Sequence, residues 1–263
     1  MTIATLDQYI ASAKQRVVLS KTTTRTTVAA GWYSMFDVAG NPGAGTLAGT
    51  STTAGVVPTD ATAGCPALNT FSGSAGYISN IQFGCTVACR IAVFDMLFKA
   101  GAYAFNANTA LSAQPSYSGR LPGTDYKGME IWVETVTAAT GNQTWNVTYT
   151  NEGGTGSRTT GAVGIGAAPA VGRCWQLPLQ AGDYGVQKID NVQGGTGSAG
   201  TANILVLRPL WTGRVIAANY GDVHDMIRTG LPQIYDTSAL VFLIAADSTS
   251  SGLPDLEIEV ANG

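Results

Sequence analysis

Charged side chains are scarce in this sequence. They make up 12% of its 263 residues, against ~25% in a typical soluble protein. The 14 Lys and Arg residues do not outnumber the 17 Asp and Glu residues, and the formal net charge is -3. Proteins that bind nucleic acid normally carry clustered basic residues in excess. The composition therefore argues against DNA or RNA as a partner.

Histidine is nearly absent as well, since His224 is the only one in the chain. Together with Asp222 and Asp225 it forms the one compact group of potential metal ligands or acid-base residues. Side chains this close in sequence do not easily face one ion, and no second histidine completes a ligand shell. We therefore expect a surface turn or a short helix over Tyr220–Arg228, with Asp222 as its cap.

The usual catalytic and cofactor motifs are missing or stand in the wrong context. No P-loop lysine pattern and no Gly-x-Ser-x-Gly elbow occurs. Residues 195–200 match the Gly-x-Gly-x-x-Gly dinucleotide pattern, but that motif requires a helix after it, and a strand is expected over Asn203–Leu207. The sequence therefore predicts a protein that is not an enzyme, with no catalytic residue, no cofactor and no metal site.

Long apolar segments and cysteines are also few. The most apolar runs, residues 91–98 and 239–246, are far shorter than the ~20 residues of a membrane-spanning helix, and no signal-peptide core follows Met1. We expect no membrane association. Four cysteines are too few for a disulfide scaffold in this chain. Cys85 and Cys89 would lie ~13 Å apart on one strand, so buried free thiols are favoured over a four-cysteine zinc site.

Alternation of apolar and polar residues dominates the chain after Tyr77. Met129–Glu134 and Trp145–Thr150 are typical of antiparallel strands with one buried and one solvated face. Glu130 and Glu134 are interpreted as solvent-facing charges. Because glycine-rich turns rather than amphipathic helices separate the strands, the pattern predicts a mainly β fold with an antiparallel β-sandwich or jelly-roll-like body. The expected strands are Tyr77–Phe83, Thr86–Phe98, Met129–Val136, Thr144–Glu152, Arg158–Val163, Arg173–Leu179, Val186–Val192, Asn203–Leu207, Ala239–Ala246 and Leu256–Val260.

A short helix is predicted at the N-terminus, over Thr5–Leu19. Thr5 is a suitable N-cap, Gln8 stands at the capping-box position, and apolar residues recur at steps of three and four. Residues 1–30 hold four basic residues and one acid, so we predict a helical arm that contacts neighbouring subunits. The alternative is a solvated helix packed on its own domain. The residues expected at the interface are Leu6, Ile10, Lys14, Arg16, Val17, Lys21 and Arg25.

The remainder of the chain, residues 31–263, is predicted to form a single β-sandwich domain. Within it, residues 40–74 are rich in Gly, Ala, Thr, Ser and Pro and almost uncharged, which indicates an irregular but ordered excursion. Because the expected strands begin near Tyr77, removal of residues 1–25 should leave a folded body that no longer associates.

Aromatic residues are the other candidates for binding. On strands they usually fill a sandwich core, but a group of them also forms a face that stacks on sugars. Both alternatives stay open for Trp32, Tyr33, Trp132, Trp145, Tyr149 and Trp175.

Several short sequence segments resemble those of a family of structural proteins from tailed-bacteriophage virions. They touch most of the chain between residues 31 and 210, whereas the residues after about 211 have no counterpart. The segments are turns and strand ends, so the resemblance brings no catalytic residue with it. They are Gly31–Phe36, Gly40–Gly45, Tyr149–Asn151, Arg158–Thr159, Leu177–Asp183 and Leu207–Leu210.

This resemblance implies a component of the phage particle. Together with the β pattern it favours a non-enzymatic capsid decoration or cement protein that binds the major capsid protein and other virion proteins and forms a homo-oligomer. Such a protein is made in the host cytoplasm and ends on the capsid surface of the virion. Two alternatives are a structural protein of the phage tail, in its tube or tip, and a carbohydrate- or receptor-binding jelly-roll module.

Overall fold

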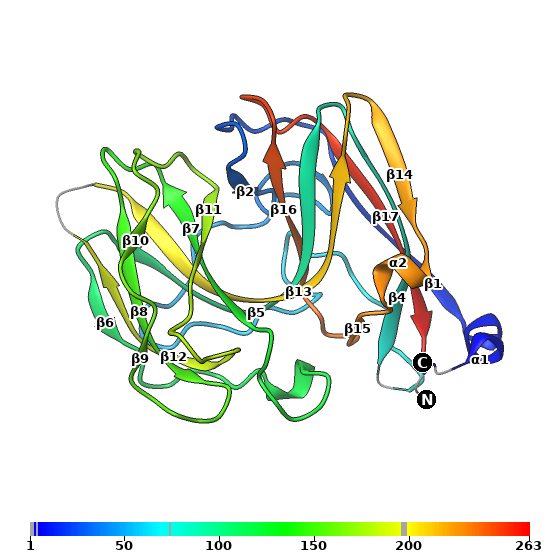
Figure 1. Ribbon diagram of the computed structural model, residues 1–263, viewed down its shortest axis with the longest axis horizontal. Helices are drawn as coiled ribbons and strands as arrows, with labels where there is room; N and C mark the ends of the chain where they lie inside the picture. Colours follow the sequence, from blue (N-terminus) through cyan, green and yellow to red (C-terminus); the bar gives the residue numbers. More distant parts are fainter. Residues whose placement is uncertain (1–2, 4, 74, 196–198) are drawn as a thin grey trace.

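Two long strands, β5 (Cys89–Ala104) and β13 (Thr201–Val215), form the centre of the molecule. They pair antiparallel almost from end to end, and in Figure 1 they cross it from one outer sheet to the other. The computed structural model describes residues 3, 5–73, 75–195 and 199–263. Residues 196–198 of the dinucleotide-like pattern lie outside the described residues.

A closed barrel is built around these two strands. Its strands follow the order β11-β2-β16-β5-β13-β7. The other four are β2 (Trp32–Ser34), β7 (Glu130–Thr137), β11 (Arg173–Leu177) and β16 (Leu240–Ala246). Closure removes the free edges that these apolar strands would otherwise expose to other chains.

Two further antiparallel sheets flank the barrel, one on each side (Figure 1). Sheet A has the order β14-β4-β17-β1-β3, with β15 also paired to β4; the second sheet, sheet D, has the order β10-β8-β12-β6, with β9 also paired to β8. The strands of sheet A are β1 (Lys14–Lys21), β3 (Gly40–Asn41), β4 (Gly76–Cys85), β14 (Tyr220–His224), β15 (Gln233–Ile234) and β17 (Pro254–Asn262). Those of sheet D are β6 (Asn108–Ala110), β8 (Thr144–Asn151), β9 (Arg158–Thr159), β10 (Val163–Gly164) and β12 (Val186–Gly194).

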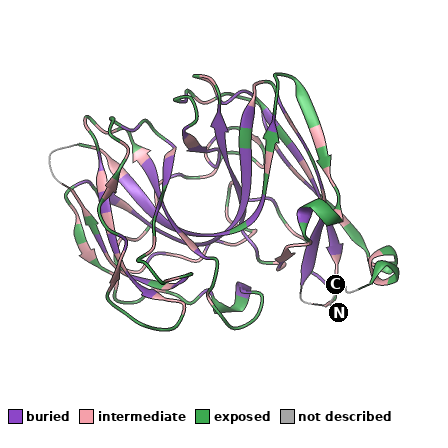
Figure 2. Ribbon diagram, in the orientation of Figure 1, coloured by how far each residue is buried: buried purple, intermediate pink, exposed green. Residues whose placement is uncertain are grey.

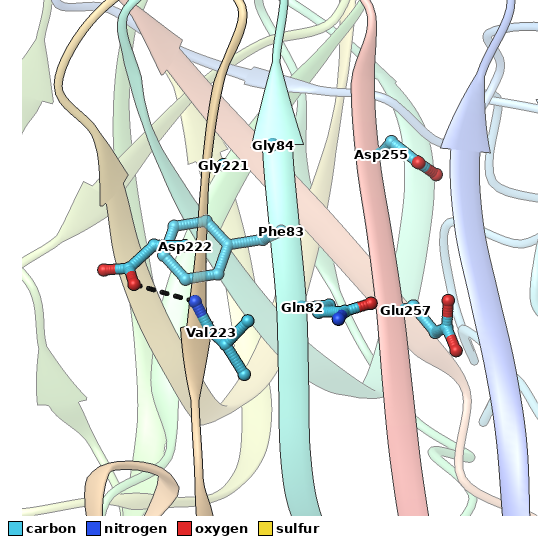
Figure 3. Close-up of a pocket in the computed structure, with 8 residues that line it drawn as sticks. All are labelled: Gln82, Phe83, Gly84, Gly221, Asp222, Val223, Asp255 and Glu257. Carbon is cyan, nitrogen blue, oxygen red and sulfur yellow. Dashed lines mark hydrogen bonds between the residues drawn. The ribbon is translucent and has the colours of Figure 1, made fainter.

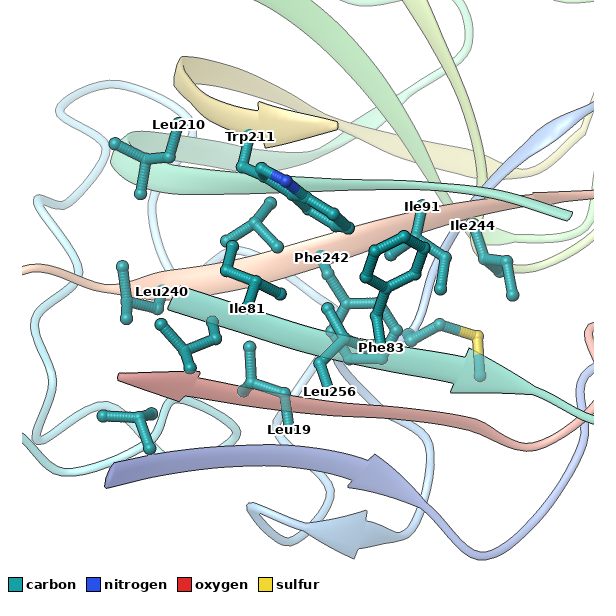
Figure 4. Packing of buried hydrophobic residues seen from close by; sticks show 14 of the residues in the cluster. Leu19, Ile81, Phe83, Ile91, Leu210, Trp211, Leu240, Phe242, Ile244 and Leu256 are labelled. Carbon is teal, nitrogen blue, oxygen red and sulfur yellow. The ribbon is translucent and has the colours of Figure 1, made fainter. Parts of the chain in front are cut away.

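The apolar side chains divide into three buried clusters that follow these layers. One fills the space between sheet A and the barrel and includes Leu19, Phe83 and Phe242 (Figure 4). A second lies between sheet D and the barrel, around Trp145. The third lines the inside of the barrel, around Phe94. In Figure 2 the central strands are coloured mainly as buried, whereas many of the loops are exposed.

The predicted mainly β, antiparallel, sandwich-like body with a short N-terminal helix is confirmed. Most expected strands are present within a few residues, but Arg158–Val163 is divided into β9 and β10, and β13 is much longer than expected. The sequence did not predict the closed barrel. Between Pro42 and Gly73 the chain forms no helix or strand, apart from a bridge that pairs Val56 with Lys99.

The predicted helix over Thr5–Leu19 is wrong in its second half. Helix α1 covers only Leu6–Ala11, and β1 follows as a strand of sheet A. β1 pairs with β17 over seven register positions and with β3 at its end. Its inward residues belong to the cluster under sheet A, so tertiary pairing overrides the helical period.

A second local prediction is corrected in the same way. Tyr220–Arg228 was expected as a surface turn or a short helix, but Tyr220–His224 is β14, and helix α2 covers Met226–Thr229. Its N-cap is Asp225, not Asp222: the Asp225 carboxylate accepts from the backbone N–H groups of Ile227 and Arg228, both at 3.1 Å. A short 3-10 turn, η1 (Ser118–Arg120), completes the described elements. Among the described residues, no helix has both the length and the apolar composition needed to cross a membrane.

Candidate functional site

Helix α1 is the part of the predicted interface that stays on the surface. Its capping box is formed, because Thr5 Oγ1 accepts from the Gln8 N–H at 3.3 Å and the Thr5 N–H donates to Gln8 Oε1 at 3.1 Å. None of the six helical residues is buried. Leu6 is 62% exposed and Ile10 is 66% exposed. No described part of the chain covers these two apolar side chains, and Figure 2 shows the helix as an exposed projection beside sheet A.

Polar contacts hold α1 in this position. The Tyr9 hydroxyl donates to Glu259 Oε1 at 2.8 Å, and this hydrogen bond to a carboxylate raises the pKa of Tyr9. The Lys14 ammonium donates to the carbonyl of Ser12 at 2.8 Å. A positive charge at this end of the helix also interacts favourably with the helix dipole. A groove of ≈ 430 Å³ separates the helix from the end of the chain; its lining includes Asp7, Ala11, Ser72 and Asn262.

The other predicted interface residues are largely engaged within the chain. Val17 is buried in the core under sheet A. The buried Lys21 donates to the Val38 carbonyl at 2.9 Å, and burial lowers the pKa of Lys21. Arg25 forms an ion pair with Asp37. These three residues make contacts within their own chain that support the fold.

The solvent face of sheet A carries a shallow hollow of ≈ 350 Å³ (Figure 3). Gly84 and Gly221 are paired across β4 and β14, so the two strands carry no side chain at this one register position. Carboxylates of Asp222, Asp255 and Glu257 surround it. The exposed Arg16 of β1 pairs with Glu257. Apart from Val223 and the buried Phe83 the lining is polar or glycine, and we assign this surface no ligand.

The mouth of the barrel carries a group of aromatic side chains around one cavity. Trp32, Phe94, Trp132, Glu130 and Gln176 contribute to the lining of a cavity of ≈ 440 Å³. The Trp132 ring meets Trp32 and Phe94 edge to face, at centroid distances of 6.3 Å and 5.7 Å. Mouths of β-barrels are a common place for small-molecule sites.

Glu130 is the charged group of this mouth. Its Oε2 accepts from Trp132 Nε1 at 2.7 Å, and burial raises the pKa of the carboxyl although that bond lowers it. Glu134 lies four residues further along the same face of β7 and is 3% exposed. The interpretation of Glu130 and Glu134 as solvent-facing charges is therefore wrong, because closure of the barrel turns this face inward.

Three of the phage-like sequence segments meet at one carboxylate, that of Asp183. Its oxygens accept from the Tyr149 hydroxyl at 2.7 Å, from Asn151 Nδ2 at 2.8 Å, and from Arg158 at 2.8 and 2.9 Å. The Arg158 guanidinium, helped by Asn151 and Tyr149, lowers the pKa of Asp183 to about 2. The cluster fastens the loop after β11 to β8 and β9, which is a structural task.

The remaining candidate residues also make structural contacts. His224 Nδ1 accepts from Trp211 Nε1 at 2.9 Å, and its ring lies edge to face against Phe83. The prediction of buried free thiols is confirmed for all four cysteines. Cys85 and Cys89 end β4 and begin β5, so the assumption that they share one strand is wrong. Among the described residues, no three His, Cys, Asp or Glu side chains group as metal ligands.

Comparison with known proteins gives no relative by sequence. No family model matches the chain, and no curated protein matches it. Among solved structures, the chain is similar to the VP2 subviral particle of infectious bursal disease virus, at 9% identity over 95% of this chain and 79% of that chain, with a TM-score of 0.23. T=1 particles derived from the same virus give 8% identity, 95% and 76% coverage and a TM-score of 0.20. Scores this low do not establish a shared fold.

Proposed function

We propose that this protein is a non-enzymatic structural component of a bacteriophage virion. In this proposal it decorates the capsid, binds the major capsid protein and a second copy of itself, and stabilises the head. The phage-like sequence segments support a role as a protein of the virion. The low charge and the antiparallel layers suit a component that packs against repeated neighbours.

The uncovered apolar side of α1 is the observation that carries the proposal. A helix of six residues is too short to be stable through propensity alone, yet this one is capped at its start and held by Tyr9 and Lys14. Its exposed Leu6 and Ile10 side chains are not packed in the hydrophobic core of their own chain. A neighbouring subunit that covered them would stabilise the contact by ~1.5–3 kcal/mol for each fully buried side chain.

Purified virions test the role directly. Mass spectrometry of DNA-filled heads and of separated tails should detect this chain in the heads. Its presence in tails alone would favour the tail tube or tip, the alternative role in the particle. Its absence from both fractions would end the proposal.

A second candidate function is recognition of a carbohydrate, and the barrel mouth favours it. Sugars bind by stacking apolar faces on aromatic rings while carboxylates and amides accept or donate hydrogen bonds to their hydroxyls. Trp32, Phe94 and Trp132 supply rings, and Glu130 and Gln176 supply polar groups, around one cavity.

A glycan array with the isolated protein tests this second function. Trp32→Ala removes a ring that is only partly buried, so the variant is expected to fold and to lose binding. Trp145→Phe, in the core beside sheet D, is the matched aromatic control and should retain binding. If the wild-type protein binds no glycan on the array, the carbohydrate-binding function is ruled out and only the structural role remains.

A further inference from the structure

A lysine, a glutamate and an asparagine are buried together inside the barrel, at the end away from its mouth. Lys99 is 5% exposed, Glu134 3% and Asn203 0%. They come from β5, β7 and β13, and β13 lies between the other two strands in the barrel. Asn203 stands opposite Glu134 in the register of β13 and β7. Three neighbouring strands thus bring an amine, a carboxyl and a carboxamide into one buried interior.

One carboxylate oxygen reaches both of the nitrogen groups. Glu134 Oε2 accepts from Asn203 Nδ2 at 2.8 Å and lies 4.0 Å from Lys99 Nζ. On its other side the Asn203 carboxamide is also held, because its Oδ1 accepts from the Gly49 N–H at 2.9 Å. The side chain of Asn203 is therefore fixed in orientation, with its carbonyl polarised by a backbone donor.

The surroundings bury these groups almost completely. The Lys99 ammonium lies 4.7 Å from the centre of the Phe36 ring and donates to the Thr46 carbonyl at 3.0 Å. Residues of the 42–73 segment cover this end of the barrel and leave a cavity of ≈ 320 Å³ beside Lys99 and Met96. A low-dielectric site strengthens each electrostatic interaction within it and disfavours separated charges.

We propose that Lys99 and Asn203 condense to form an intramolecular isopeptide bond, with Glu134 as the proton carrier. Glu134 takes a proton from the Lys99 ammonium, and the neutral Nζ attacks Cγ of Asn203. The Nζ–Cγ bond forms, Glu134 passes protons from Nζ to Nδ2, and the Cγ–Nδ2 bond breaks. One ammonia molecule leaves, and no oxidant, reductant or cofactor is consumed.

Gly49 has a specific part in this step. Its N–H points at Asn203 Oδ1, where negative charge develops when the amine adds to the carbonyl. A Cβ on Gly49 would lie 2.8 Å from the backbone nitrogen of Gly101, so the segment can approach only with glycine at this position. The bond therefore forms only after the 42–73 segment has packed on the barrel. The product would join β5 to β13 covalently, whether or not the protein belongs to a virion.

Intact-mass spectrometry of the purified, denatured full-length chain tests the proposal. The expected mass is lower than that of the sequence by one ammonia, about 17 Da, and digestion should yield a branched peptide that joins Lys99 to Asn203. A chain at its full sequence mass overturns the proposal. So does a deficit that maps to another asparagine.

Variants then test the named roles. Lys99→Met and Asn203→Ala should restore the full mass, while Lys127→Met, at an exposed lysine, should keep the deficit. Glu134→Gln should leave most of the chain unlinked. A Glu134→Gln chain that is linked as completely as the wild type would remove Glu134 from the mechanism. The mass of the wild-type chain is measured without any variant. The proposal can therefore be tested even if a substitution destabilises the barrel.

Discussion

The two halves of the N-terminal segment have opposite places in the molecule. Residues 14–21 form β1 inside sheet A and bury Val17 and Leu19 in the core, whereas residues 6–11 form α1, which buries nothing. Both halves carry apolar residues at regular spacing, so the difference lies in what covers them. β1 is part of the fold, and α1 is left for a contact outside it.

Of the changes that test this comparison, deletion of residues 1–25 is expected to have the largest effect on the stability of the fold. The deletion removes β1, exposes the edge of β17 and opens the core beneath sheet A. We predict a chain without a cooperative thermal unfolding transition, in contrast to the expectation from sequence that a folded body would remain. Deleting residues 1–11 is the control and should preserve the transition. If the 1–25 deletion unfolds like the wild type, β1 is not part of the core.

Single leucine substitutions sharpen the same contrast. Leu19 is 1% exposed on β1, so Leu19→Ala should lower the free energy of unfolding by about 2–4 kcal/mol. Leu6→Ala on α1 should change it by less than ~0.5 kcal/mol. Denaturant unfolding followed by tryptophan fluorescence measures both values. Equal losses at the two positions would show that α1 packs on its own chain.

A smaller effect concerns the attachment of α1 at high pH. The Glu259 carboxylate raises the pKa of Tyr9 because it accepts a hydrogen bond from the protonated phenol and so stabilises that form. The bond therefore contributes fully below the ordinary tyrosine value of about 10 and is lost as pH rises through the raised value. We predict that amide-exchange protection of residues 9–12 falls several-fold between pH 8 and pH 11.

Tyr9→Phe is the control for this titration. It removes the hydroxyl but keeps the ring that lies under the Lys14 ammonium, 4.4 Å from its centre. Protection in this variant should already be low at pH 8 and should not depend on pH. A variant with the same pH dependence as the wild type would mean that another group controls α1.

The fold class was predictable from local patterns, whereas the partners of the strands were not. The alternation in β7 and β8 and the capping box at Thr5 are signals within a few residues. The residues of β1 fit both a helical and a strand period, and the strand that decides between them, β17, lies more than 230 residues away. Nothing local to β1 resolves that choice.

The candidate sites show the same limit. Leu6 and Ile10 were predictable as an apolar helix face, but not that the chain leaves them uncovered. Trp32 and Trp132 are a hundred residues apart and meet only because the barrel closes. Lys99 in a mostly apolar strand was a visible signal, since a buried lysine needs partners. The partners themselves, Glu134 and Asn203, follow from the register alone.

The central claim is that the exposed side of α1 makes the contact with a neighbouring subunit. Its most direct test is the occupancy of a Leu6→Ser/Ile10→Ser variant on phage particles, measured by quantitative mass spectrometry beside an Ile216→Ser control. Ile216 is 67% exposed, comparable with Ile10, but lies in the turn between β13 and β14, and β14 is separated from β1 in sheet A by β4 and β17. We predict that the double variant folds and falls to a small fraction of wild-type occupancy, while Ile216→Ser remains at the wild-type level. Wild-type occupancy of the double variant would contradict the account.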